Sequence, residues 1–462
     1  MTESTTGTAA SEARAPLVRP WAVIFVGFTG ARVLGFLFSV AATRLLPKAE
    51  FGSLTYALTI VGLGSVFLSS APIGLSRYLL VHHHEHEARD AYYTNWLAGI
   101  GLLLALSIVA APLVGGGAGL SVSATAAVAL NFVGIAVLET YRELQRGADR
   151  FVELTATYLA ANLLQLLLVV ALGLAGKRSS VLYLAVYGLS PVAVVLPLLL
   201  LQPLEFAWRP TSIARARLIE IGRFVLPVLV QSVCFAIWFG ADVVLLRRTS
   251  GLETTAEYGA AKTLTFAILM PATALAQVLM PRAAAVPDGR LRVYIARMLG
   301  LTAVATVPVA LAITVLGGFL ATRVFGETYR RSADVLPVIA IGMTFAGIYL
   351  VASRVWIGRA RPTVDLAATA TGMVVTLASG LLLVPSLDMV GAGTAFAFGA
   401  AIRLVVIVAY SMLYTPDYTP DSRPSASAGP TFAARRAVRM NESNRDVSSM
   451  STRLVAPGRR AD

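Results

Sequence analysis

Residues 97–115 decide the fold, and they read LAGIGLLLALSIVAAPLVG. This stretch contains no charged side chain. A helix of about 20 mostly apolar residues is long enough to cross the roughly 30 Å hydrocarbon core of a bilayer. Inside that core the backbone must satisfy its own hydrogen bonds, which favours a helix over an isolated strand. The stretch therefore predicts a membrane-spanning helix.

Similar apolar runs recur on both sides of this stretch, joined by short connections rich in Gly, Pro, Arg or Asp. The runs predict an all-α integral membrane protein of about twelve transmembrane helices, with no room for an extramembrane domain. The predicted spans are 21–43, 53–72, 92–114, 118–141, 153–175, 181–203, 219–246, 256–281, 293–322, 333–357, 364–386 and 390–413.

The composition agrees with a membrane protein. Of 462 residues, 56% are hydrophobic and 14% are charged, whereas soluble domains carry about 25% charged residues. The net charge of +13 does not indicate nucleic-acid binding, because the arginines lie between apolar runs and in the C-terminal tail, without interleaved aromatic residues.

The single cysteine, Cys234, allows no intrachain disulfide. The run 82–87 has ligand types for zinc or nickel, but a solvated loop is the simpler interpretation.

The loops also predict an orientation. Residues 1–20 are polar and do not resemble a cleaved signal peptide, so the first apolar run is expected to be retained. The loops on the N-terminal side of the membrane carry more Arg and Lys than the opposite loops, which predicts that both termini are cytoplasmic and that the protein lies in the cell membrane. Residues 414–462 are rich in Ser, Pro, Thr and Arg and are predicted to form a disordered basic tail.

An internal repeat divides the chain into halves. Residues 50–52 (Glu-Phe-Gly) recur as 257–259 (Glu-Tyr-Gly), and residues 150–154 resemble 361–366 at a similar offset. Because each unit has six spans, the two copies are expected to be parallel repeats related by an axis along the membrane normal. The predicted parts are a cytoplasmic tail over 1–20, a first six-helix bundle over 21–203, a cytoplasmic linker over 204–218, a second bundle over 219–413 and the tail over 414–462.

Two arginines lie near the middle of predicted spans, Arg32 in the first and Arg403 in the twelfth. A charge at that depth is costly unless it faces a cavity or a partner. The planar guanidinium suits the oxygens of a phosphate, so these residues are candidates for holding an anionic substrate. The alternative is a structural pair with a carboxylate or with backbone carbonyl groups.

Three further polar residues complete the candidate substrate-binding set. Asp242 and Lys262 lie nearer the ends of the seventh and eighth spans, where they could form an ion pair. Asp242 could instead bind a coupling cation. Gln277 could donate hydrogen bonds to sugar hydroxyls, as could Gln165, Asn162 and Gln231, although helix–helix hydrogen bonding is equally open to them.

Several segments together resemble the polysaccharide flippases of the Wzx type, which belong to the multidrug/oligosaccharidyl-lipid/polysaccharide transporter superfamily. They are the Glu-Phe-Gly turn at 50–52, the sequence Gly-Leu-Ser-Arg at 74–77, the segment 356–362 and Asp242 before Leu245 and Leu246. The resemblance covers about 21–413. It implies two six-helix bundles that flip a polyprenyl-diphosphate-linked oligosaccharide from the inner to the outer leaflet. The lipid II flippases are similar but typically have two further helices.

The sequence therefore predicts a flippase for lipid-linked oligosaccharides that works by alternating access in cell-surface polysaccharide synthesis. Its expected partners are the lipid-linked oligosaccharide, membrane lipids and a glycan polymerase or glycosyltransferases. A multidrug cation antiporter of the same superfamily is the alternative, although central arginines favour an anionic substrate. A membrane glycosyltransferase is the third hypothesis, and no catalytic constellation supports it. We expect no enzyme activity and no cofactor, and no nucleotide-binding loop is present in the sequence.

Overall fold

A computed structural model describes residues 18–72, 74–81, 85–148, 150–201, 206–283, 286–359 and 361–413. Within these residues every regular element is helical, which confirms the all-α prediction. The predicted C-terminal tail, most of the N-terminal tail and His82, His83 and His84 lie outside them. Of Arg77 and Gln277 only the backbone is described.

The first half of the chain forms helices that follow the predicted spans and extend beyond several of them. They are α2 (Val18–Leu45), α3 (Lys48–Gly64), α4 (Val66–Ser70), α5 (Leu75–Val81), α6 (His86–Gly117), α7 (Val122–Gly147), α8 (Phe151–Leu174) and α9 (Ser180–Leu201).

The second half begins after a short 3-10 turn, η1 (Pro210–Ser212). Its elements are α10 (Arg215–Thr265), η2 (Phe266–Ile268), α11 (Leu269–Ala283), α12 (Asp288–Leu320), a π-helical turn η3 (Ala321–Phe325), a 3-10 turn η4 (Glu327–Tyr329), α13 (Ser332–Gly358) and α14 (Pro362–Leu413). Among the described residues of the whole chain, eight helices are long and apolar enough to cross a membrane.

Helix α10 is a hairpin of two helical segments. Asp242 and Lys262 are in contact, although residues 20 apart in a continuous helix would lie about 30 Å apart. The chain reverses at Gly251, whose φ of 88° and ψ of −173° are accessible essentially to glycine alone. The first segment corresponds to the predicted seventh span, and the second segment, together with η2 and α11, corresponds to the predicted eighth span.

Helix α14 reverses in the same way at Asp388, where φ is 52°. Gly372 packs against the aliphatic stem of Arg403, and Gly399 packs against Thr376, so the two segments are antiparallel neighbours. The two segments correspond to the predicted eleventh and twelfth spans, while the total of twelve stays a prediction.

Adding a methyl group at Gly251 provides a direct test of the first reversal. The added Cβ would meet nothing within 4 Å, so the Gly251→Ala change acts through the backbone alone and is expected to cost about 1–3 kcal/mol. Gly101→Ala in α6 also adds a methyl group in open space, but at a helical position, where alanine is favoured by roughly 0.5–1 kcal/mol. Thermal unfolding of the purified protein in detergent should therefore shift down for the first variant and not for the second. Equal shifts would contradict a turn that requires glycine.

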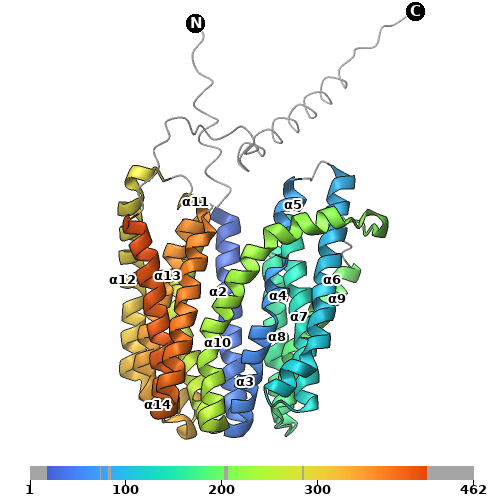
Figure 1. Cartoon of the computed structure of the whole chain (residues 1–462). Helices are drawn as coiled ribbons and strands as arrows, with labels where there is room; N and C mark the ends of the chain where they lie inside the picture. The colour runs from blue at the N-terminus through green and yellow to red at the C-terminus, as the bar shows by residue number, and fades with distance from the viewer. Residues whose placement is uncertain are drawn as a thin grey trace, which may run out of the picture. The chain divides into compact units, whose positions relative to one another are not determined.

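The helices pack into two groups (Figure 1). In the first half α7 contacts α6, α8 and α9, and in the second half α13 contacts α11, α12 and α14. Helix α10 packs on α13 and α14 and also contacts α3, α4 and α6 of the first half. Helices α3 and α10 therefore carry the interface between the halves.

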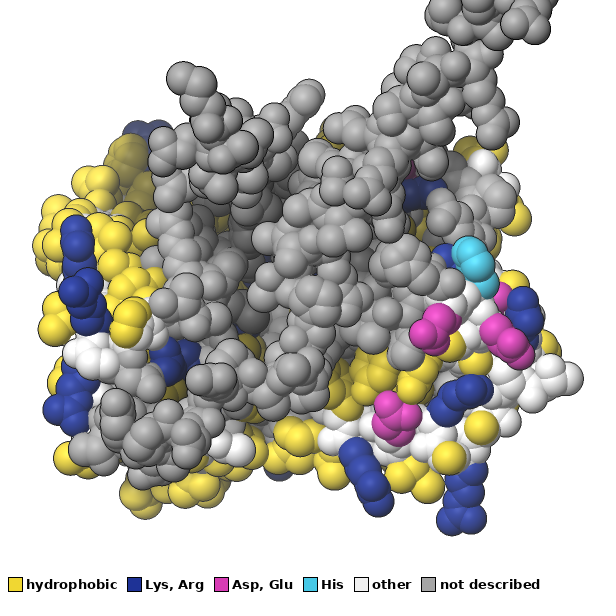
Figure 2. Space-filling view, turned by 90° about the horizontal axis from the view of Figure 1, so that it is seen from above, with side chains coloured by type: hydrophobic (Ala, Val, Ile, Leu, Met, Phe, Trp, Pro, Cys, Tyr) yellow, Lys and Arg dark blue, Asp and Glu magenta, His cyan; other side chains and the backbone are white. Residues whose placement is uncertain are grey.

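Arginines stand at the end of this unit where α6 and α12 begin. Figure 2 views this end, where Lys and Arg side chains lie around the rim, beside hydrophobic side chains on one side and near Asp and Glu side chains on the other. The exposed arginines near the helix ends on this side are Arg146, Arg209, Arg215, Arg223, Arg290, Arg292, Arg297 and Arg361. In the predicted orientation this end is cytoplasmic.

Candidate functional site

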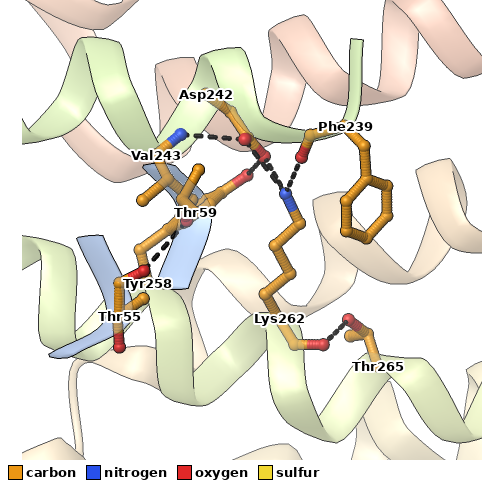
Figure 3. Close-up of polar contacts among 8 residues, drawn as sticks. All are labelled: Thr55, Thr59, Phe239, Asp242, Val243, Tyr258, Lys262 and Thr265. Carbon is orange, nitrogen blue, oxygen red and sulfur yellow. Dashed lines mark hydrogen bonds and ion pairs between the residues drawn. The ribbon is translucent and has the colours of Figure 1, made fainter. Parts of the chain in front are cut away.

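A buried ion pair lies inside the α10 hairpin (Figure 3). Lys262 Nζ is 2.7 Å from Asp242 Oδ2 and 3.0 Å from Oδ1, and it also donates to the carbonyl oxygen of Phe239 at 2.5 Å. The Asp242 side chain is 0% exposed. The structure thus brings together two of the predicted site residues.

Two neutral groups also donate hydrogen bonds to the Asp242 carboxylate. The Tyr258 hydroxyl donates to Oδ2 at 2.6 Å, and the backbone N–H of Val243 donates to Oδ1 at 2.8 Å. With the ammonium group of Lys262, both carboxylate oxygens are engaged by protein donors. In this conformation the carboxylate has no free oxygen for a coupling cation.

This pair lies close to the interface between the two halves of the chain. A methyl group added at Gly259 would lie 2.6 Å from Thr55 Cγ2 of α3, and one added at Gly240 would lie 2.9 Å from Thr59 Cγ2. Glycine at these positions allows α3 to approach both arms of the hairpin. Movement between the halves must therefore change the surroundings of the ion pair.

Arg403 lies in an aromatic cage in the second half. Arg403 is 3% exposed. Its guanidinium carbon is 3.9 Å from the ring centre of Tyr349 and 4.0 Å from that of Trp238. One guanidinium nitrogen donates a long 3.4 Å hydrogen bond to Thr369 Oγ1, and Nε has no hydrogen-bond partner. No ion pair within 4.0 Å joins Arg403 to a described carboxylate.

Aromatic rings connect Arg403 with the ion pair. Lys262 Nζ lies 4.3 Å from the ring centre of Phe239 and 5.1 Å from that of Phe396. Phe396 stacks on Trp238 with ring centres 5.0 Å apart, and Trp238 covers Arg403. Two cations thus share one aromatic cluster, which stabilises them by cation–π attraction.

The sequence analysis did not predict this aromatic cluster. Residues 235, 238, 239 and 242 follow each other at intervals of three, one and three, which places three aromatic rings and one carboxylate on one face of a helix. This spacing is the sequence pattern from which the aromatic cluster could have been predicted.

Arg32 lies apart from this cluster, on the first half. It is exposed on α2, whose glycines pack on α8, with Gly35 opposite Asn162 and Gly30 opposite Leu159. The structure therefore does not join Arg32 to Arg403. The backbone of Gln277 lies in α11, and its side chain is outside the described residues.

A second charged cluster, also not predicted, joins the halves at the end where α10 and α14 reverse. Lys48 Nζ of α3 lies 2.6 Å from Glu257 Oε1, and Glu257 is 1% exposed. Arg331 approaches the other oxygen of Glu257 at 3.8 Å. Arg44 of α2 donates to the carbonyl oxygens of Arg323 and Val324 in η3. We call Arg44, Lys48, Glu257 and Arg331 the interlobe latch.

Aromatic residues pack beside the latch. Phe51 of α3 meets Tyr329 edge to face at 5.9 Å between ring centres. Burial, together with the negative charge of Glu257, holds the pKa of Tyr329 well above its ordinary value. Its hydroxyl therefore stays neutral at physiological pH, and the charge of the latch comes from the carboxylate and the three cations.

Solved structures show the class of protein to which this fold belongs. The chain is similar to an inward-facing multidrug resistance transporter of the MATE family (13% identity, 83% of this chain and 94% of the other, TM-score 0.69). It is also similar to the lipid II flippase MurJ in an inward closed conformation (12% identity, 85% and 88%, TM-score 0.71). A superfamily transporter from Pyrococcus furiosus, described as having a binding pocket of reverse polarity, aligns over 89% of this chain and 98% of its own length (14% identity, TM-score 0.59). The chain therefore has the two-lobed helical membrane fold of these proteins.

The family follows from the sequence match. Residues 17–286 match the model of the polysaccharide biosynthesis protein family, and the chain belongs to that family. This match confirms the resemblance inferred from the motifs at 50–52, 74–77 and 242. No curated protein shows a significant match.

Proposed function

We propose that this protein is a flippase that moves a polyprenyl-diphosphate-linked oligosaccharide from the inner to the outer leaflet for cell-surface polysaccharide synthesis. Membership in the polysaccharide biosynthesis family carries this proposal. The fold shared with a lipid flippase and with multidrug transporters supports a transport role over a catalytic one. The proposed location is the cytoplasmic membrane, with both termini cytoplasmic.

The distribution of charge supports an anionic substrate. The carboxylate of Asp242 is engaged by Lys262, Tyr258 and Val243. Arg32 and Arg403 lie in helices of the two halves and form no ion pair with a described carboxylate. Neither guanidinium is therefore neutralised by a described carboxylate, and the exposed Arg32 can accept phosphate oxygens as partners, for which arginine is the best-suited side chain.

In the proposed cycle the two arginines act in sequence. Arg32 is exposed and would meet the diphosphate first, while the oligosaccharide is on the cytoplasmic side. Arg403 is enclosed by Trp238 and Tyr349, so it would contact the substrate only after the helices around it move. The interlobe latch would keep the outer end closed until then, and a glycan polymerase or glycosyltransferases would act on the released product.

A cation antiporter remains the second candidate, since similar solved structures include multidrug transporters. That function would require an acidic group free to bind a cationic substrate. Asp242 could become free only if Lys262 moved away from it. Transport of a lipophilic cation that is lost in the Asp242→Asn variant would support the antiporter over the flippase.

The Arg32→Ala variant tests the flippase directly. Charge-assisted contacts to phosphate contribute about 1.5–3 kcal/mol each, so we expect flipping to fall roughly 10- to 100-fold. The measurement is the amount of lipid-linked glycan in each leaflet, at matched protein levels. Arg32→Lys should retain part of the activity, and Arg223→Ala at the cytoplasmic end of α10 should change little. Unchanged flipping in both Arg32→Ala and Arg403→Ala would exclude their role in holding phosphate.

A further inference from the structure

A hollow of about 400 Å³ lies where α12, η3, η4 and α13 meet. It is lined by Gly318, Phe319, Thr322, Glu327, Arg330, Ala333 and Asp334. Ser332, beside these residues, donates to the carbonyl oxygen of Glu257. The hollow is therefore at the latch end of the molecule, away from the Asp242 and Arg403 cluster.

The charges around the hollow are of both signs and do not neutralise each other. Glu327 and Asp334 carry negative charge, and Arg330 lies between them in the sequence. Although they are three and four residues apart, no ion pair within 4.0 Å joins these three exposed side chains. A ligand that carries an ammonium group and a phosphate could satisfy the two carboxylates and the guanidinium at once.

An apolar stripe leads along α12 to this hollow. Leu311, Val315 and Phe319 recur every fourth residue and are exposed, so they lie on one face of the helix. In a membrane this face contacts acyl chains. The hollow thus lies where a lipid would have its headgroup if its chain followed the stripe.

We propose that the hollow binds the headgroup of a zwitterionic aminophospholipid of the ethanolamine type. Its primary ammonium donates to Glu327 and Asp334, its phosphate accepts from Arg330, and an acyl chain lies along α12. A quaternary choline headgroup has the same charges but no N–H to donate. The carboxylates therefore discriminate between the two headgroups.

The site is connected to the interlobe latch. Thr322, in the wall of the hollow, belongs to the π-helical turn η3. The carbonyl oxygens of Arg323 and Val324 in this turn accept hydrogen bonds from Arg44 of the first half. A bound headgroup would hold η3 in the conformation that Arg44 recognises, and so would favour closure at this end.

A lipid titration of the full-length protein, followed by native mass spectrometry, tests the site. We expect dioleoyl-phosphatidylethanolamine to bind about tenfold more tightly than dioleoyl-phosphatidylcholine, the difference that a charge-assisted hydrogen bond gives. Glu327→Gln with Asp334→Asn should abolish this preference. The same change of two charges in Glu85→Gln with Glu87→Gln, at exposed residues at the other end of the molecule, should not.

A steric variant tests the hollow without changing any charge. A Cβ at Gly318 would come no closer than 3.9 Å to Ala333 Cβ, and Gly318 lines the hollow, so the side chain of Gly318→Leu is expected to extend into it. It should reduce binding of the ethanolamine lipid about tenfold, whereas Gly300→Leu on the same helix, which faces open space, should not. Equal affinity for the two lipids, or equal effects of the two leucines, would overturn the proposal. The titration contains no glycan, so its result is independent of the proposed flippase activity.

Discussion

The Lys262→Met variant is expected to lose about 3–5 kcal/mol of unfolding free energy. Removing one member of a buried ion pair leaves the other charge without compensation in a low-dielectric interior. Here the remaining charge is Asp242, which is 0% exposed and would keep only the Tyr258 hydroxyl and one backbone N–H. The measurement is thermal or denaturant unfolding of purified protein in detergent.

The double variant Asp242→Leu, Lys262→Met distinguishes charge from packing. Removing both charges should recover most of the loss, because well-packed apolar residues can replace a buried ion pair at little cost. Lys177→Met, at an exposed position, controls for the change of side chain and should leave the unfolding free energy unchanged. If the double variant were as unstable as Lys262→Met alone, the buried charge would not be the cause.

The Glu257→Gln variant is expected to open the latch end of the molecule. Removing one charge from a buried, hydrogen-bonded pair costs about 2–5 kcal/mol. Because Lys48 and Glu257 belong to different halves, the loss of their ion pair destabilises the closed conformation. A change of 2–3 kcal/mol shifts the ratio of closed to open conformers roughly 30- to 150-fold. Spin labels at Ala49 and Thr328, both exposed, would report the change as a longer distance distribution.

Glu253→Gln is the matched control for this experiment. Glu253 lies one turn before Glu257 and also approaches Lys48, at 3.9 Å, but its side chain is 71% exposed. Exposed ion pairs contribute about 0–1 kcal/mol, so the same charge change should leave the distances almost unaltered. Equal opening in both variants would mean that net charge at this end matters, and not the buried pair.

The sequence predicted individual positions better than contacts between them. Asp242 and Lys262 could be proposed as a pair because each lies at a similar distance from the turn at Gly251. Arg403 could be selected as a charge within an apolar run. Its cage could not be predicted, because Trp238, Tyr349 and Thr369 come from separate helices whose rotation about their axes depends on packing.

The interlobe latch shows the same limit. Glu257 served as a marker of the internal repeat, but Lys48 lies 209 residues before it, and no local pattern joins the two. The headgroup hollow likewise depends on η3, a π-helical turn that apolar periodicity does not predict. In each case the contact depends on how the helices pack in the folded protein.

The amino-acid sequence by itself determined that this protein is an all-α membrane protein of repeated spans, where its reversals occur and which charges lie within apolar runs. These properties depend on the hydropathy of neighbouring residues and on backbone preferences at single positions, so they can be inferred locally. Only the tertiary structure decided that Asp242 is neutralised by Lys262, that Arg403 is enclosed by aromatic rings and that Glu257 holds the halves together. Those outcomes depend on short-range contacts between helices, which form only when the whole unit is packed.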